Sequence, residues 1–236
     1  MAQLADVIRQ PNGLLNVATG TVQDVKALNI FGFNRTVETS WETVWNDGGI
    51  YSYPTSAVQM DVDSTSAADT MQLSIAGLDA NYHKISETVT LNGTTAVTTT
   101  QSFLRINSAI IVSGENAGDI EISEGGTKYG WVEAGLGTTQ ALNHTVPAGH
   151  ALYIYRIDFN SGTVNPNKYL MVRNHLVSSA GRVLNVAEST FQTGELSVDR
   201  QVPFRIPEKT DFSFQARSSS STNEISIFVE AIEVKE

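Results

Sequence analysis

The chain has 236 residues, enough for one large β domain or two small ones with a buried core. It contains no cysteine, which excludes disulfides, thiolate metal ligands and a cysteine nucleophile. With 25 acidic and 15 basic residues the formal net charge is -10, and a surface of that sign repels the phosphates of DNA and RNA. We therefore expect no nucleic-acid partner.

The N-terminal sequence lacks the basic region and the long apolar run of a secretory signal. No run of about 18 apolar residues, the length that spans a bilayer, occurs anywhere in the chain. We therefore expect a protein that is assembled in a cytosol and has no membrane partner.

Residues 1–26 contain the only helical pattern. Leu4, Val7 and Ile8 recur at helical spacing for less than two turns, before the Pro-Asn-Gly sequence at 11–13 ends the pattern. So short a helix is unstable alone, and its apolar side chains are expected to pack on a neighbour. The sequence predicts an N-terminal arm over residues 1–26, with these three side chains as contact residues.

From residue 27 onward the apolar pattern has period two, which is typical of strands. In Asp211–Arg217 the apolar residues are all at even positions, which predicts one buried and one solvated face. Tyr153, Tyr155, Ile157 and Phe159 are expected to share one face of a central strand, and the C-terminal strand is expected to be buried on both faces.

The turn residues agree with a β protein. Asn92-Gly93 between two strand-like runs predicts a hairpin, and Glu124–Gly126 predicts a second turn. Many short strands with such turns predict an all-β fold made of β-sandwich or jelly-roll modules. The glycines of Gly135–Gly137 predict a boundary between a first β module at 27–136 and a second, jelly-roll-like module at 137–236.

Catalytic and metal-binding motifs are scarce. The four histidines are scattered, and the acidic sequence that starts at Asp61 has Ser66 where a calcium loop of the EF-hand type needs glycine. No GxSxG, Walker A or GxGxxG motif occurs. We expect no catalytic residue, no metal site and no cofactor, so the chain is predicted not to be an enzyme.

The tryptophans are the remaining candidates for recognition. Trp41 and Trp45 are an even number of residues apart and would share a strand face, and Trp131 lies in another strand-like run. Their rings could stack on sugars, but packing in the core or in a protein interface is the favoured interpretation. Trp41 and Trp45 are therefore predicted interaction residues.

Several sequence blocks resemble structural proteins of marine tailed bacteriophages, including cyanophages. The resemblance covers most of residues 27–236 and leaves the N-terminal 26 residues outside it. The blocks are Phe31–Arg35, Trp41–Gly49, Tyr51–Pro54, Gly77–Tyr82, Ser86–Thr94, Ser102–Ser108, Val146–Gly149 and Arg205–Asp211.

The resemblance implies a virion component without catalytic residues. The leading hypothesis is a capsid cement or decoration protein that binds the major capsid protein or other virion proteins, and the acidic charge favours the outer surface of the capsid over its DNA-facing lumen. A homo-oligomer, most plausibly a trimer, is expected because edge strands need cover. The alternatives are a tail or baseplate adaptor and a carbohydrate- or receptor-binding module; a glycan-degrading enzyme ranks last.

Overall fold

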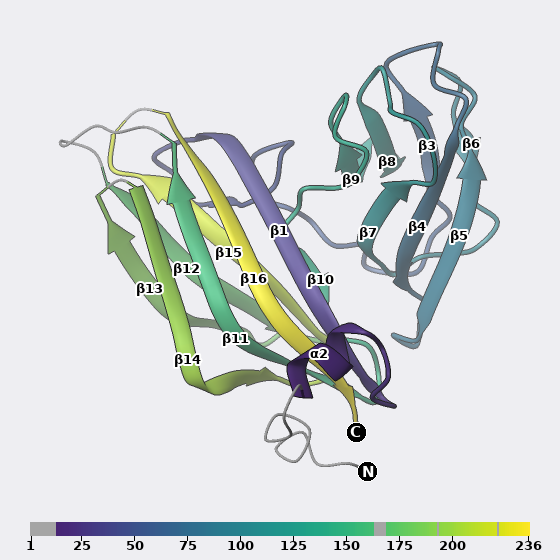
Figure 1. Cartoon of the computed structure of the whole chain (residues 1–236). Helices are drawn as coiled ribbons and strands as arrows, with labels where there is room; N and C mark the ends of the chain where they lie inside the picture. The colour runs from purple at the N-terminus through teal and green to yellow at the C-terminus, as the bar shows by residue number, and fades with distance from the viewer. Residues whose placement is uncertain (1–12, 163–168, 193, 221) are drawn as a thin grey trace.

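The computed structural model describes residues 13–162, 169–192, 194–220 and 222–236. Antiparallel strands form nearly all of its regular structure, so the predicted all-β class is confirmed. The described part of the chain has a single helix, α2 (Gly13–Ala18), and no helix there is long and apolar enough to cross a membrane. The strands form two bodies, seen on the left and right of Figure 1.

The larger body, called the sandwich domain below, consists of two facing sheets. The first has the order β1 (Val25–Val37), β16 (Asn223–Lys235), β11 (His150–Ser161) and β14 (Gly194–Ile206). The second has the order β10 (Asn143–Thr145), β15 (Thr210–Ser218), β12 (Leu170–Ser178) and β13 (Val183–Phe191), and β2 (Glu42–Thr43) also pairs with β15.

The inner faces of these two sheets form the main core. Because alternate residues of a strand point to the same face, the even-numbered residues of β15 all point inward. Phe212 and Phe214 are almost fully buried, and the Phe214 ring lies 5.4 Å from Phe212 and 5.6 Å from Phe159 between ring centroids. The predicted inward orientation of both phenylalanines is confirmed.

The smaller body, called the inserted domain, is formed by the chain between β2 and β10. One sheet has the order β6 (Val97–Thr98), β3 (Asp61–Ser64), β8 (Ile120–Glu124) and β9 (Thr127–Val132). The other has the order β5 (Lys84–Thr90), β4 (Gln72–Leu78) and β7 (Arg105–Ile111). A second hydrophobic core lies between these sheets.

The strand pairing does not follow the predicted modules 27–136 and 137–236. Strand β1 pairs with β16 over most of its length, from Val25 opposite Val234 to Asn34 opposite Ile225. The start of the predicted first module is therefore part of the sheet that contains the end of the second. Period-two alternation identifies a strand but carries no information on its partner, which explains the difference.

Helix α2 lies on the outer face of the first sheet, beside the end of β16 (Figure 1). Its Val17 packs against Val25 and Ile232 in a small separate cluster. The sequence predicted an arm over residues 1–26 whose only helical pattern lay before Pro11, so this helix was not predicted. A helix of six residues is unstable alone, and this apolar contact stabilises it. The predicted arm residues Leu4, Val7 and Ile8 lie outside the described residues.

The hairpin predicted at Asn92-Gly93 is wrong, although the chain does turn there and Gly93 has a φ of 58°. Strand β5 before the turn pairs with β4, whereas β6 after it pairs with β3 in the other sheet. The second predicted turn is confirmed, because Gly125 and Gly126 connect the paired strands β8 and β9 with Glu124 opposite Thr127.

Candidate functional site

The two domains are joined by a buried ion pair between Arg105 of β7 and Asp211 of β15. Arg105 Nε lies 2.7 Å from Asp211 Oδ1 and Nη2 lies 2.9 Å from Oδ2, so the pair is bidentate. Thr145 Oγ1 donates a further hydrogen bond of 2.6 Å to Asp211 Oδ1, and Arg105 Nη1 donates to the carbonyl oxygens of Pro54 and Leu104. Both charged groups are therefore satisfied without water.

Aromatic rings surround this pair and hold the guanidinium in place. The Arg105 guanidinium carbon lies 4.8 Å from the Tyr53 ring centroid and 5.6 Å from that of Tyr82. Burial lowers the pKa of Arg105, but its hydrogen bonds and charge interaction with Asp211 outweigh that effect and the net shift is upward. Arg105 therefore stays charged, and the arrangement is that of a structural clamp between domains.

A second polar cluster lies at one end of the interface between the domains. Glu233 of β16 is buried and lies 2.5 Å from Lys84 Nζ and 3.6 Å from His144 Nε2. Burial raises the pKa of Glu233, but the interactions of its carboxylate with His144 and Lys84 outweigh burial and bring its pKa to about 2. Glu233 is thus an ionised carboxylate at neutral pH.

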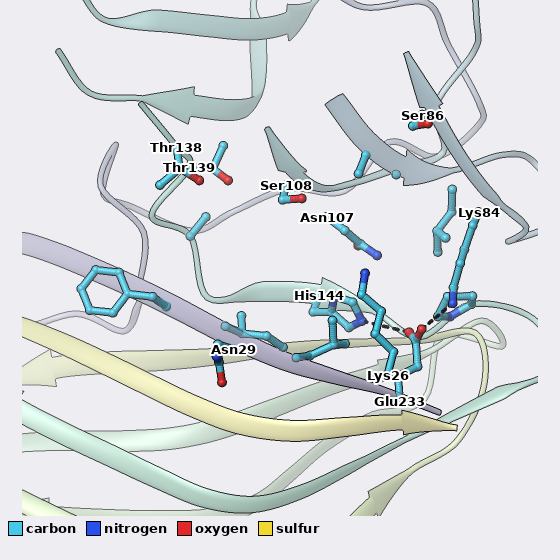
Figure 2. Close-up of a pocket in the computed structure, with 18 of the residues that line it drawn as sticks. Lys26, Asn29, Lys84, Ser86, Asn107, Ser108, Thr138, Thr139, His144 and Glu233 are labelled. Atoms are coloured by element: carbon cyan, nitrogen blue, oxygen red, sulfur yellow. Dashed lines mark hydrogen bonds and ion pairs between the residues drawn. The ribbon is translucent and has the colours of Figure 1, made fainter. Parts of the chain in front are cut away.

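This cluster borders a cleft of about 490 Å³ between β1 and the sheet formed by β5, β4 and β7. Figure 2 shows Lys26 pointing from β1 into the cleft toward Asn107, with Ser86 and Ser108 on the opposite wall. The close-up also shows the side chains of Lys84 and His144 converging on Glu233. The cleft is a candidate binding site.

The other candidate site is the edge strand β13 of the sandwich domain. It pairs with β12 on one side, and no strand among the described residues pairs with its other side. Val183, Leu184 and Val186 are 53%, 40% and 47% exposed, so apolar side chains on both faces of this strand contact solvent. A long exposed apolar edge strand is a template for pairing with another chain.

The edge strand β14 of the other sheet contains a proline, which β13 lacks. Both edge strands have an irregular register: Ile154 is opposite Phe204 whereas Arg156 is opposite Asp199, and in β13 the register also shifts once. Pro203 lies in the irregular part of β14 and has no N–H to offer to a neighbour. Because a proline discourages edge pairing, β13 is the more competent edge for assembly.

The structure places the two predicted tryptophans in different surroundings. Trp41 is partly buried, and the guanidinium carbons of Arg173 and Arg217 lie 4.1 Å and 4.8 Å from the centroid of its ring. Trp45 is 4% exposed, and its ring packs edge-on against Tyr51 at 5.1 Å. Trp45 therefore packs inside the chain, in agreement with the interpretation favoured from the sequence. A role of Trp41 in binding another molecule stays a prediction.

The sequence did not single out Arg105, Asp211, Glu233, Lys84 or the β13 edge as functional. These charged residues lie far apart in the chain and carry no shared motif; only the recurrence of Arg105 and Asp211 in the resembling blocks was a signal. Within the described residues no group of three or more His, Cys, Asp and Glu side chains could hold a metal ion.

No protein-family model and no curated protein matches the sequence. Comparison with solved structures finds infectious bursal disease virus, Gt strain, at 9% identity and a TM-score of 0.27, covering 90% of this chain and 73% of that chain. The Gx strain of this virus is 8% identical with a TM-score of 0.26, and the match covers 89% of this chain and 72% of that chain. The VP2 subviral particle of the same virus is 9% identical with a TM-score of 0.20, and the match covers 91% of this chain and 77% of that chain. Likenesses of this size carry no argument about function.

Proposed function

We propose that the chain is a non-enzymatic structural protein of a bacteriophage virion. In this proposal it acts as a capsid cement or decoration protein on the outer surface of the head, and it assembles as a homotrimer. The observation that carries the proposal is the uncovered edge strand β13, because an exposed apolar edge is suited to a protein that is covered by neighbours in its working state.

The connectivity of the sandwich domain supports the proposal by analogy. Apart from the two-residue strand β2, the domain has eight strands in chain order, β1 followed by β10 to β16. One sheet contains the first, eighth, third and sixth of these strands, and the other contains the second, seventh, fourth and fifth. This is the order of a two-sheet jelly roll, an architecture that recurs in viral capsid proteins and in lectins. Fold analogy alone does not define function.

Two further features favour a position on the particle exterior. The formal charge of -10 disfavours contact with packaged DNA in the lumen. The sequence blocks that resemble structural proteins of tailed phages include residues of the Arg105–Asp211 clamp, so the resemblance extends to the contact that joins the domains. An inserted domain joined to the sandwich domain by this buried ion pair is suited to projecting from a shell.

Replacing exposed apolar residues of the β13 edge with charged residues should abolish self-association of the chain. The double substitution Leu184→Lys and Val186→Lys places charges on an edge that neighbours would cover, so sedimentation velocity should show monomers where the unchanged chain forms oligomers. The matched control is Ile110→Lys, which charges an apolar residue of similar exposure (53%) on the inserted domain and should leave the oligomer unchanged. A double variant that associates as strongly as the unchanged chain would contradict the assignment of this edge.

A further inference from the structure

The cleft between the domains has the size and setting of a ligand site. Its volume of about 490 Å³ lies within the range of roughly 300–1,000 Å³ that small-molecule sites occupy. It continues into a smaller hollow of about 280 Å³ that Lys26, Lys84 and Glu233 also line. Sites of this kind occur preferentially between domains, and the Arg105–Asp211 clamp holds these two domains together.

Lysines outnumber carboxylates around these two hollows, which Asp24 and Glu233 also line. The chain has six lysines, and three of them, Lys26, Lys84 and Lys235, line one or both hollows. Glu233 is neutralised by Lys84 at 2.5 Å, whereas Lys26 has no carboxylate within ion-pair distance among the described residues. In a protein with a net charge of -10, an unpaired lysine directed into a cleft favours an anionic ligand.

The opposite wall offers uncharged hydrogen-bonding groups. Ser86 of β5 and Ser108 of β7 lie on the face of their sheet that borders the cleft, with Ala76 of β4 opposite both of them in the pairing register. Neither serine hydroxyl has a hydrogen-bond partner within the part of the chain that the structure describes. Each can donate one hydrogen bond and accept two, which matches the requirements of sugar hydroxyl groups.

His144 closes one end of the cleft beside Glu233. It is 9% exposed and lines the cleft, and its Nε2 has no hydrogen-bond partner among the described residues. The Glu233 carboxylate is 3.6 Å away, an ion-pair distance that is too long for a good hydrogen bond. Because the Nε2 atom is itself buried and lies toward Glu233, it does not face the cleft, and the free hydrogen-bonding groups there are the hydroxyls of Ser86 and Ser108.

We infer that this cleft binds an acidic polysaccharide, with a sugar carboxylate held by Lys26 and sugar hydroxyls bonded to Ser86 and Ser108. The inference goes beyond the proposed structural role, and it concerns a different face of the molecule from β13. A single free cation beside several hydroxyl groups matches a sugar carboxylate better than a polyphosphate, because the adjacent charges of a polyphosphate would need several cations.

Binding by the full chain can be measured by isothermal titration calorimetry with a uronic-acid oligosaccharide, a neutral oligosaccharide of the same length and inorganic phosphate. The uronate should bind, and both other probes should bind at least about tenfold more weakly. Lys26→Gln should weaken uronate binding by about tenfold, equivalent to about 1.4 kcal/mol. Lys26 is exposed and makes no ion pair among the described residues, so this variant should fold normally.

The matched control is Arg182→Gln, which removes one exposed positive charge from the turn between β12 and β13 and should leave uronate binding unchanged. Four results would overturn the inference: no uronate binding, equal binding of uronate and phosphate, equal binding of the neutral sugar, or equal losses in Lys26→Gln and Arg182→Gln. Any of these would leave the oligomerisation test of β13 unaffected, so failure of the cleft and failure of the structural role are distinguishable.

Discussion

Replacing Phe214 with alanine should lower the free energy of unfolding by about 3–5 kcal/mol. The side chain is 1% exposed and packs against Phe212 and Phe159 at the centre of the sandwich core. Its removal loses the transfer free energy of the ring and leaves a cavity that the surrounding strands cannot fully close. Urea denaturation followed by tryptophan fluorescence measures the change.

The control for this variant is Val202→Ala, which shortens an apolar side chain that is 78% exposed in the same domain. Its effect should stay within about 0.5 kcal/mol, as for other surface substitutions. If Phe214→Ala cost no more than Val202→Ala, the packing of β15 into the core would be disproved.

Replacing Arg105 with methionine should destabilise the protein by a similar amount, about 3–5 kcal/mol. The side chains of Arg105 and Asp211 are 9% and 8% exposed, so the substitution leaves a buried carboxylate with only the Thr145 hydroxyl as a side-chain partner. Its cost arises from the uncompensated charge and from the loss of contact between the domains. Chemical denaturation and limited proteolysis would record both effects.

The exposed pair Arg205–Glu236 provides the comparison, because its side chains are 46% and 43% exposed. Arg205→Met should cost no more than about 1 kcal/mol, as is usual for surface ion pairs. The double variant Arg105→Met with Asp211→Leu should recover part of the lost stability, because it removes the orphaned charge. An Arg105→Met chain as stable as the Arg205→Met chain would show that the domains do not depend on the clamp.

The alternating pattern predicted strands well, but it failed where a strand is irregular. In β11 the sequence predicted that Tyr153, Tyr155, Ile157 and Phe159 share a face, whereas the inner face holds Leu152 and Ile154 and then Ile157 and Phe159. A bulge between Ile154 and Arg156 adds a residue and exchanges the two faces. Alternation alone does not reveal a bulge, because both sets of residues are apolar.

The polar face of β15 shows a second limit of the sequence. Asp211, Ser213 and Gln215 alternate with apolar residues and were predicted to be solvated, yet they are only 6%, 4% and 5% exposed. Arg105 of the inserted domain contacts Asp211, and Arg173 donates to Gln215. A polar strand face that contacts other parts of the protein has the same alternating sequence pattern as a face that contacts water. The prediction of a solvated face was wrong because the pattern does not distinguish these two cases.

The candidate sites depend on contacts that are distant in sequence. Arg105 and Asp211 are 106 residues apart, and Lys84 and Glu233 are 149 residues apart. No spacing rule connects such pairs, and their positions become meaningful only when β1 pairs with β16 and brings the inserted domain beside the sandwich. For β13, apolar residues alternate weakly with polar ones, so its sequence identified a strand but not an uncovered edge.

A cryo-EM reconstruction of the intact particle that carries this chain tests the proposed structural role most directly. Decoration predicts density for the two-domain chain at many symmetry-related positions on the outer surface of the head, with the β13 edge against a neighbouring subunit. Density confined to a ring on the tail or baseplate, or a β13 edge left open to solvent, would contradict this account.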